Sequence, residues 1–263
     1  MKNSSNKLIP ASTVLIVRDG KNDLEVFMVV RHHEIDFASG ALVFPGGKVD
    51  KEDLNIQINQ FITKEKKISD EELGFLIAGI RECYEEAGVL FANSSENSMR
   101  ITKDRLSQLQ VWRDRFNNKE SSMYDFASQE NLTFTVDDLI PYAHWITPEM
   151  MPKRFDTRFY IAKAPEGHKG LHDGGESVDS IWISPKQAIE DCNANKRTII
   201  FPTRMNLEKL SKFDNVEDAI TSLRKEEIVT VEPKIEKNDD GVFLTIPENA
   251  GYGKIREPIE NLK

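Results

Sequence analysis

The sequence is poor in cysteine and contains no long hydrophobic run. Its two cysteines, Cys83 and Cys192, offer neither a disulfide framework nor the Cys-x-x-Cys spacing of a metal site. No run of about 18 apolar residues occurs, and the amino-terminal stretch MKNSSNKLIP lacks the apolar middle of a signal peptide. We therefore expect a soluble protein without a membrane partner, located in the cytoplasm or in an organelle matrix.

Positive charge is also scarce. The 263 residues include 35 lysines and arginines against 44 aspartates and glutamates, which gives a formal net charge of -9. Proteins that follow nucleic-acid phosphates normally carry a basic stripe, so nucleic acid is not an expected partner. A small anionic substrate would need a few local cations. The chain is long enough to bury a full core, and its oligomeric state stays open, a homodimer included.

Runs rich in β-forming residues occur on both sides of a helical region. Runs at 12–17 and 24–31 flank a turn that contains Asp-Gly, which predicts a hairpin. Later strands are predicted in LTFTV (132–136), AHWIT (143–147), TRFYIAKA (157–164) and SVDSIWIS (177–184). Helical patterns cover 68–90 and much of 92–130, and Ser184 with Pro185 marks another helix start. These patterns indicate an α/β fold with a mixed sheet between helices, followed by a charged tail with a possible hairpin.

The clearest helix contains an unusual concentration of acidic residues. Ser69 and Glu72 form a capping-box signal for its start, and Gly88 marks its end. At about 100° per residue, the apolar side chains gather on one face, and three acidic residues fall roughly opposite: Glu82, Glu85 and Glu86. This acidic row is either a solvated helix face or a site for a hard divalent cation such as Mg²⁺, which takes oxygen ligands.

The stretch FPGGKVDKED lies upstream of this helix. Pro45 fixes a turn, and Gly46 and Gly47 let backbone groups approach a ligand closely. Asp50 and Asp53 add carboxylates to the same stretch. Alone, Pro-Gly-Gly is an ordinary turn, but together with the acidic helix it favours a site for a metal and a phosphate group.

Together the two stretches resemble the Nudix box. Its pattern is Gly, five residues, Glu, seven residues, then Arg-Glu-aliphatic-x-Glu-Glu-x-Gly-aliphatic. Here Gly47 and Asp53 precede the run RECYEEAGV at 81–89. Asp53 occupies the position of the first Glu, and residues 54–80 place 27 residues where the family has seven. The insertion leaves open whether Asp53 reaches the metal site.

Other motifs extend the resemblance beyond the box. The stretches SGALVFPGGKVDKEDL, RFDTRFYIA, DGGESVDSIWISPKQAI and FPTRMNLEKL are similar to the branch of Nudix hydrolases that includes the mitochondrial and peroxisomal acyl-coenzyme A diphosphatases and their bacterial relatives. The resemblance implies a Nudix fold, an α/β/α sandwich, over residues 8–215, with the box at 47–89, its insertion at 54–80 and a helical insertion at 92–130. Residues 216–263 would form a short C-terminal extension of unknown role.

The resemblance also implies a chemistry and the residues that carry it. Nudix enzymes use Mg²⁺ or Mn²⁺ to hydrolyse a diphosphate linked to another moiety. Carried over to this sequence, Arg81 would hold the carboxylates in place, and the metal ligands would be Glu82, Glu85, Glu86 and the carbonyl of Gly46. The general base would be Glu85 or Glu86, or else Glu176 in the loop HDGGESVD, with Asp179 as a further candidate.

Substrate phosphates need cations as well as metal ions. The candidates are Arg31 and Arg158, followed by Arg154 and Arg204. The favoured substrate is coenzyme A or an acyl-coenzyme A, cleaved to 3′,5′-ADP and (acyl)phosphopantetheine; ADP-ribose, NADH or a nucleotide sugar is the alternative. Two other classes are a catalytically silent nucleotide-binding module, against which the retention of Arg81, Glu82, Glu85, Glu86 and Gly88 argues, and an isomerase on the same fold, for which no signature is present.

Overall fold

A mixed sheet of eight strands forms the centre of the molecule. The computed structural model describes residues 7–31, 40–65, 67–172 and 177–259. Along the sheet the strands follow the order β10 (Ser177–Ile183), β2 (Leu24–Arg31), β1 (Ile9–Asp19), β9 (Phe155–Lys163), β8 (Ile140–Ile146) and β11 (Thr230–Val231), while β3 (Leu42–Val43) pairs with β2 and β4 (Gly46–Lys48) with β1. The predicted hairpin is confirmed as β1 and β2, which are antiparallel, whereas β1 and β9 run parallel.

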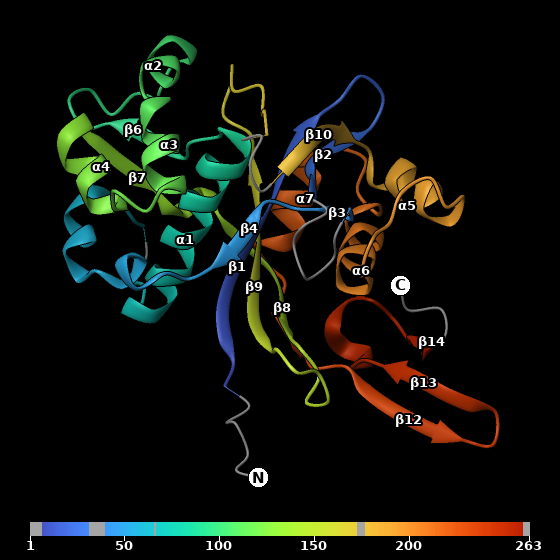
Figure 1. Cartoon of the computed structure of the whole chain (residues 1–263). Coiled ribbons are helices and arrows are strands. Elements are labelled where there is room, and N and C mark those ends of the chain that lie inside the picture. The colour runs from blue at the N-terminus through green and yellow to red at the C-terminus, as the bar shows by residue number, and fades with distance from the viewer. Residues whose placement is uncertain (1–6, 32–39, 66, 173–176, 260–263) are drawn as a thin grey trace.

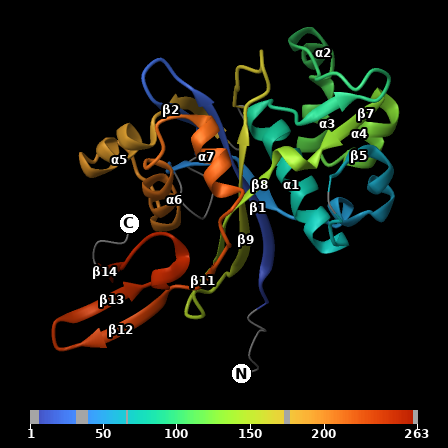
Figure 2. The same ribbon diagram turned by 180° about the vertical axis from the view of Figure 1, so that it is seen from behind.

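Helices cover both faces of this sheet, as Figure 1 shows. Alternate residues of β1 explain why: Val14 and Ile16 pack into the core under one face, and Leu15 and Val17 into the core under the other. The first core is closed by α1 (Asp70–Ala87), and the second by α5 (Pro185–Asn193), α6 (Phe201–Leu210) and α7 (Val216–Leu223), which Figure 2 shows from behind. The predicted α/β/α sandwich is therefore confirmed.

Helix α1 begins and ends where the local sequence predicts. The Ser69 side chain accepts a hydrogen bond from the Glu72 backbone N–H, and Gly88 adopts the left-handed conformation with φ of 62°. The Glu72 side chain does not complete a capping box, because it instead accepts a hydrogen bond from the Tyr160 hydroxyl and pairs with Arg158. The side chain of Glu72 thus ties the first turn of α1 to the sheet.

The two expected insertions fold together into one lobe on the outer side of α1, at the left in Figure 1. The short helix η1 (Lys51–Leu54) leads into the first insertion, which contributes η2 (Ile56–Phe61) and strand β5 (Ile62–Thr63). The second contributes β6 (Ala92–Ser94), α2 (Lys103–Gln108), α3 (Val111–Asn117) and α4 (Met123–Glu130), and β7 (Leu132–Thr135) follows it. Strand β7 lies between β5 and β6 in a small sheet. The helical nature of 92–130 is confirmed, and residues 70–80 of the first insertion belong to α1 itself.

An aromatic cluster fixes this lobe to α1. The ring of Tyr84 stacks on that of Phe126 with centroids 5.2 Å apart, and the centroid of the Trp112 ring lies 4.9 Å from that of Phe126. The Tyr84 hydroxyl donates to the Leu109 carbonyl at 2.6 Å, so its one polar atom is satisfied inside the cluster. Because Tyr84 belongs to the box run at 81–89, the lobe is packed directly against the box helix.

The C-terminal segment is more closely integrated than the sequence indicates. Helix α7 packs under the sheet through Val216, Ala219 and Leu223, all at most 1% exposed, and β11 pairs in parallel with β8. The expected boundary at residue 215 is therefore displaced, because residues 216–231 complete the core. The predicted hairpin is confirmed as β12 (Lys234–Asn238) and β13 (Gly241–Thr245), which projects from the body in Figure 1 and pairs with β14 (Arg256–Pro258).

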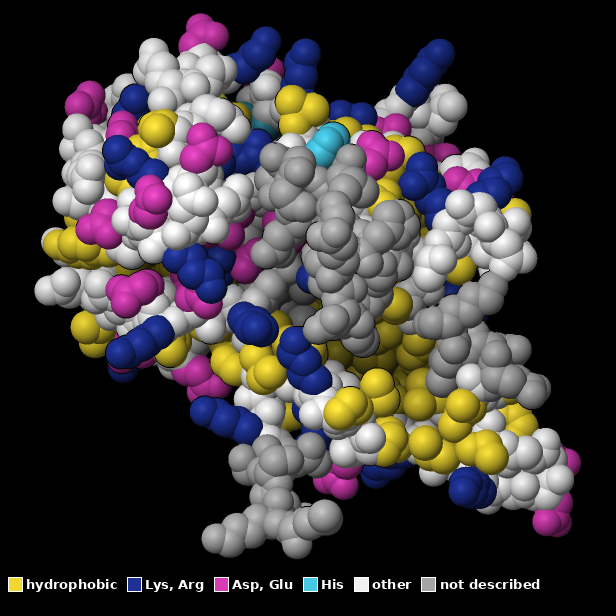
Figure 3. All heavy atoms as spheres, in the orientation of Figure 1, with side chains coloured by type: hydrophobic (Ala, Val, Ile, Leu, Met, Phe, Trp, Pro, Cys, Tyr) yellow, Lys and Arg dark blue, Asp and Glu magenta, His cyan; other side chains and the backbone are white. Residues whose placement is uncertain are grey.

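Hydrophobic side chains gather where this hairpin joins the body, as the space-filling view in Figure 3 shows. The segment between β13 and β14 is fixed to the core: Trp145 donates to the Tyr252 hydroxyl at 3.0 Å, and Tyr252 donates to the Asn206 side chain at 2.7 Å. Among the helices in the described parts of the chain, none combines the length and the apolar character needed to cross a bilayer.

Candidate active site

Strand β4 and the C-terminal half of α1 form the site. Gly46, Gly47 and Lys48 pair with Thr13, Ser12 and Ala11 of β1, and the Gly46 N–H donates to Glu86 Oε2 at 3.0 Å. The Glu82 carboxylate lies against Gly47 so closely that a Cβ there would be 2.3 Å from its Oε1. Only glycine leaves this space. The glycine therefore allows a close approach, but the group that approaches Gly47 is a carboxylate of the helix. The expected approach of a ligand to this turn stays a prediction.

The acidic residues of α1 are not a solvated face. Glu82 and Glu86 are each 8% exposed, and Glu85 is partly buried. The alternative that this row only keeps the helix soluble is wrong for these residues, because β4, η1 and the lobe cover that side of α1. Buried carboxylates are rare without a partner, so the fold must supply one.

Arg81 is that partner. Its Nε and Nη2 donate to the two oxygens of Asp53 at 3.0 and 2.9 Å, a bidentate pair. Its Nη1 donates to Glu82 at 2.9 Å and to Glu85 at 3.2 Å. The remaining Nη2 proton has the Lys48 carbonyl oxygen at 2.9 Å. One guanidinium thus orients three carboxylates and the loop that precedes them, as the resemblance implies for this position.

The structure answers the question that the insertion raised about Asp53. Its side chain is 2% exposed, and it accepts the Asp50 N–H at 2.8 Å in addition to both Arg81 bonds. The inserted residues loop out into the lobe and return, so Asp53 keeps its place beside the helix across 28 positions of sequence. Both of its oxygens are engaged by Arg81 and Asp50. Asp53 therefore supports the site through Arg81.

The site has more negative charge than one arginine can balance. Burial raises the pKa of Glu82 to about 8, with Arg81 opposing and the charges of Glu85 and Asp53 adding to the effect. Burial likewise raises the pKa of Glu85 and the pKa of Asp53, again against the attraction of Arg81. A divalent cation would relieve this excess, and carboxylate and carbonyl oxygens are the ligands that Mg²⁺ and Mn²⁺ prefer.

The carboxylate and carbonyl oxygens at this site are of the kind that bind such a cation, but the carboxylates do not converge on one point. Among the described residues, no three His, Cys, Asp or Glu side chains converge as a metal cluster. Glu82 and Glu85 are turned toward Arg81, and the Gly46 N–H holds Glu86. The residues that could hold the ion are still those expected, Glu82, Glu85, Glu86 and the neighbouring Gly46 carbonyl, because they are the oxygen donors gathered at this junction.

Of the other expected residues, Asp179 lies away from the junction and the contacts of Arg31 do not place it there. Glu176 lies outside the described residues. Asp179 is exposed on β10, where it accepts the Ser180 N–H, and β2 separates that strand from β1. Arg31 ends β2, whose partner β3 leads into the Pro-Gly-Gly turn, and its side chain is partly exposed. A phosphate contact by Arg31 stays a prediction.

The expectation for Arg158 is wrong. Its guanidinium pairs with Glu72 and Glu71 in the first turn of α1 and lies 4.0 Å from the centre of the Phe75 ring. Glu72 precedes Glu82 by ten residues, about 15 Å along a helix. Arg158 therefore joins the sheet to the far end of α1. The two further arginine candidates are also engaged elsewhere, Arg154 with Glu232 and Arg204 with Glu257.

The sequence analysis did not identify Arg113, which supports the site from the lobe. Arg113 on α3 is 7% exposed, and its Nη2 donates to the Glu85 carbonyl oxygen at 2.7 Å and to the Leu171 carbonyl oxygen at 3.1 Å. It therefore fixes the C-terminal end of the box helix to the lobe and to the segment after β9. The only available signal was its place beside Trp112 in a helix that buries an aromatic face.

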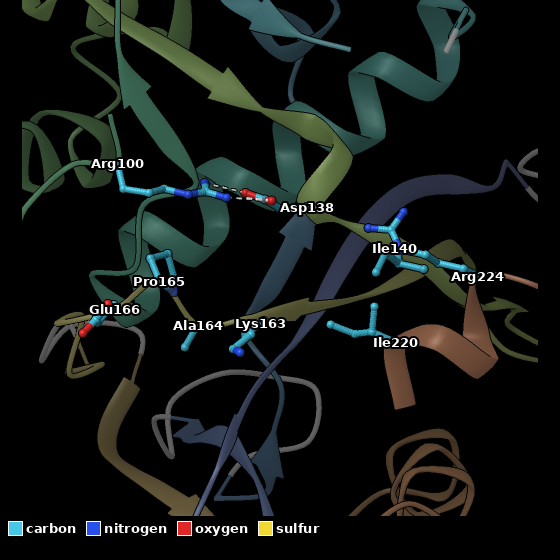
Figure 4. Close-up of a pocket in the computed structure, with 9 residues that line it drawn as sticks. All are labelled: Arg100, Asp138, Ile140, Lys163, Ala164, Pro165, Glu166, Ile220 and Arg224. Atoms are coloured by element: carbon cyan, nitrogen blue, oxygen red, sulfur yellow. Dashed lines mark hydrogen bonds and ion pairs between the residues drawn. The ribbon is translucent and has the colours of Figure 1, made fainter. Parts of the chain in front are cut away.

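Two cavities of about 270 Å³ border these elements. One lies between the box and the lobe and is lined by Asp53, Arg81 and Glu85 from the box helix and the loop before it. The other, drawn in Figure 4, lies at the end of β9 between Arg100, Lys163 and Arg224, and no box residue lines it. The first cavity is therefore the one that opens on the candidate site.

Comparisons with known proteins agree with this geometry. A family model described as the NUDT19 Nudix domain matches residues 55–210. A Caenorhabditis elegans protein named as a nudix hydrolase is 29% identical over 201 residues, 76% of this chain and 60% of that protein. The acyl-coenzyme A diphosphatase NUDT19 of Xenopus laevis is 24% identical over 278 residues, 89% of this chain and 73% of that protein. The chain thus spans about 60% of the length of the nematode relative.

The fold has a solved counterpart. The crystal structure of a NUDIX hydrolase from Alicyclobacillus acidocaldarius aligns with a TM-score of 0.70 and 24% identity, covering 85% of this chain and all of that one. At this identity the likeness concerns the fold, which is the same sandwich. The matching family model spans more than half of the chain and includes the run at 81–89. The chain therefore belongs to the Nudix family, in the group described by the NUDT19 Nudix domain.

Proposed function

We propose that this protein is a metal-dependent hydrolase that cleaves the diphosphate linkage of a nucleoside diphosphate derivative, with coenzyme A or an acyl-coenzyme A as the favoured substrate. The observation that carries the reaction class is the burial of Glu82, Glu85 and Glu86 around Arg81 at the Gly46–Gly47 turn. A silent binding module has no need to hold this excess of buried negative charge. The substrate class is supported by the acyl-coenzyme A diphosphatases among the relatives.

Some of these residues would bind the metal ion, and others keep the metal-binding side chains in position. Glu82, Glu85, Glu86 and the Gly46 carbonyl would hold Mg²⁺ or Mn²⁺, which when bound neutralises the diphosphate and makes a coordinated water more acidic. Arg81 keeps Glu82 and Glu85 in place, and Asp53 keeps Arg81 in place. A protein arrangement fixed before the substrate arrives avoids reorganisation during the reaction.

The hydrolysis itself needs one proton acceptor. Water adds to one phosphorus, the bond from that phosphorus to the bridging oxygen breaks, and the bridging oxygen leaves with the other phosphate. The acceptor of the water proton is proposed to be Glu85 or Glu86, or Glu176 from its loop. With coenzyme A the products are 3′,5′-ADP and phosphopantetheine, and with an acyl-coenzyme A the second product carries the acyl group.

Product analysis by mass spectrometry tests this proposal. Wild type, Glu86→Gln and the control Glu71→Gln are incubated with coenzyme A, acetyl-coenzyme A, ADP-ribose, NADH and a nucleotide sugar, with Mg²⁺ and with EDTA. Glutamine keeps an oxygen for the Gly46 N–H, so Glu86→Gln removes charge with little loss of structure. Glu71 lies on the same helix with its side chain 73% exposed, so the control makes the same chemical change outside the site.

The outcomes separate the candidate functions. Metal-dependent release of 3′,5′-ADP by wild type and Glu71→Gln, lost in Glu86→Gln, supports the proposal in full. Cleavage of ADP-ribose, NADH or the nucleotide sugar in preference to coenzyme A keeps the reaction and rejects the substrate. Absence of cleavage with every compound, together with tight nucleotide binding, rejects the hydrolase and favours the silent module.

A further inference from the structure

The Ser12 hydroxyl is buried beneath the box helix. Ser12 is 0% exposed, and its Oγ has no hydrogen-bond partner in the part of the chain that the structure describes. A buried hydroxyl without a partner has lost its hydrogen bonds to water and has gained none in return. Such groups are rare in native proteins and are often explained by a role in binding or catalysis.

Ser12 lies under the middle of the box helix. Helix α1 crosses the sheet from β9, where Arg158 pairs with its first turn, to β4, where Glu82 lies against Gly47. The Ser12 backbone is paired with Arg158 on one side and with Gly47 on the other. A Cβ added to Gly79 of α1 would be 2.9 Å from the Ser12 Oγ. The hydroxyl therefore points toward the helix.

The Glu82 carboxylate lies one strand away from this hydroxyl, on the same face of the sheet. In an antiparallel pair, opposite residues point to the same face with their Cβ positions about 4.5–5.5 Å apart. The Glu82 Oε1 lies 2.3 Å from the position that a Cβ on Gly47, the residue opposite Ser12, would take. Gly79 and Glu82 are also neighbours on the helix surface, at positions i and i+3. The hydroxyl is therefore beside the carboxylate without being bonded to it.

Glu82 is a proposed metal ligand that is turned toward Arg81. Its Oε1 accepts a hydrogen bond from Arg81 Nη1 at 2.9 Å, and the same Nη1 donates to Glu85 at 3.2 Å. A carboxylate that binds a cation is usually held by hydrogen bonds from neighbouring donors. A donor on the sheet side of Glu82 would hold the carboxylate when it turns from Arg81 to a bound ion.

We propose that Ser12 is a positioning residue of the metal-bound site, where its hydroxyl donates a hydrogen bond to the Glu82 carboxylate. This inference rests on the proposed function and adds a residue to the set that holds the ion. The hydroxyl is without a partner while Glu82 is turned toward Arg81, and it gains one when Glu82 binds the cation. A hydrogen bond made only in the metal-bound state adds its free energy to metal affinity and not to folding.

The proposal predicts opposite effects of one substitution on folding and on metal binding. Ser12→Ala removes an unpartnered hydroxyl from the metal-free protein, so its urea unfolding midpoint without metal should equal or exceed that of wild type. The same variant should bind Mn²⁺ about tenfold more weakly, the effect of one lost hydrogen bond to a charged group. A serine that only packs beneath the helix would change the midpoint without changing the Mn²⁺ affinity.

Electron paramagnetic resonance measures this affinity, because it reports the unbound Mn²⁺ as the ion is titrated into metal-free protein without substrate. Ser211→Ala is the matched control. Ser211 follows α6 on the other side of the sheet, and its hydroxyl donates to the Glu208 carbonyl at 2.8 Å. This control loses a hydroxyl that has a partner, so its unfolding midpoint should fall, and its Mn²⁺ affinity should stay within about twofold of wild type.

A double-mutant cycle tests whether Ser12 acts through Glu82. Glu82→Gln removes the charged acceptor, so adding Ser12→Ala to it should change the remaining Mn²⁺ affinity by less than about twofold. A further tenfold loss in the double variant would show that Ser12 acts elsewhere. An unchanged affinity in Ser12→Ala alone would overturn the assignment. A fall in both its affinity and its metal-free unfolding midpoint would give Ser12 a packing role instead.

Cleavage of coenzyme A by the same proteins separates this inference from the proposed function. If both hold, raising the Mn²⁺ concentration about tenfold should restore the rate of Ser12→Ala. If wild type binds Mn²⁺ and cleaves no test compound, the weaker binding by Ser12→Ala still supports the role of Ser12, and the hydrolase fails. If wild type cleaves coenzyme A while Ser12→Ala binds Mn²⁺ as tightly as wild type, the hydrolase stands and the inference fails. A wild type that binds no Mn²⁺ at millimolar concentration removes the metal site and the inference with it.

Discussion

Replacing Asp53 by asparagine removes one charge of a buried pair while keeping the shape of the side chain. In the native protein Asp53 is 2% exposed and receives two hydrogen bonds from Arg81, whose side chain is 9% exposed. Burial raises the pKa of Asp53, with Arg81 opposing, whereas burial lowers the pKa of Arg81 but Glu82, Asp53 and Glu85 together raise it above its ordinary value. The loss of Asp53 leaves a buried guanidinium without its main partner.

The size of the effect follows from what Arg81 retains. Breaking a buried ion pair typically costs about 3–5 kcal/mol. Because Glu82, Glu85 and the Lys48 carbonyl remain in contact with Arg81, we expect the lower end, a loss of about 3 kcal/mol in the free energy of unfolding. For a chain of this length that corresponds to a fall in Tm of roughly 6–12 °C. Diphosphatase activity should fall with it, since Arg81 also orients Glu82 and Glu85.

Urea unfolding followed by circular dichroism measures the change, with Glu52→Gln as the control. Glu52 neighbours Asp53 in the same short helix and lines the same cavity but is exposed. The Glu52→Gln variant also loses one carboxylate, and we expect its free energy of unfolding to differ from that of wild type by at most about 0.5 kcal/mol. A change of that small size in Asp53→Asn would refute the reasoning, because Arg81 would then be shown not to depend on Asp53.

Three further predictions concern other parts of the structure. Gly47→Ala should reduce kcat by about 100-fold with the fold intact, because a Cβ 2.3 Å from Glu82 Oε1 displaces that carboxylate; unchanged steady-state kinetics would contradict the placement of Glu82. Truncation after residue 215 should give an aggregated protein in size-exclusion chromatography, because it removes the buried Val216, Ala219 and Val231, whereas a monodisperse product would show that α7 and β11 are dispensable. Burial lowers the pKa of His168, whose Nδ1 accepts the Leu90 N–H while Nε2 faces the Ile101 carbonyl. The neutral ring is favoured in the folded state, so unfolding free energy measured in urea should fall as pH drops below about 6.5, by at most ~1.4 kcal/mol per pH unit, and His168→Gln should flatten that slope.

Local signals made the central part of the site predictable from the sequence. The limits of α1 follow from Ser69 and Gly88, and the spacing of Glu82, Glu85 and Glu86 along one helix places them near one another whatever the rest of the chain does. The close approach of Gly47 was also readable, because glycine pairs mark such contacts. These features depend on neighbours within a few residues.

Features that depend on distant partners were missed or misjudged. Arg158 was expected at phosphate, but the parallel pairing of β1 with β9 places it beside the first turn of α1, where Glu71 and Glu72 neutralise it. The role of Asp53 could not be read because its partner lies 28 positions away, beyond an insertion of unknown path. Strand β11 has two residues, too few to show any periodicity, so its place in the sheet was invisible in the sequence.

The pairing of β5 with β7 also determines how this protein can be engineered. The Ile62–Thr63 segment of the first insertion runs parallel to Phe134–Thr135 of β7, which lies just beyond the second insertion, and Ala92–Ser94 at the start of the second insertion pairs with the other side of β7. Deleting either inserted segment therefore leaves one edge of β7 unpaired. In a chimera with a Nudix protein that lacks the lobe, both segments must therefore be exchanged together with the outer face of α1, as a single cassette. Any substrate preference that resides in the lobe would travel with that cassette.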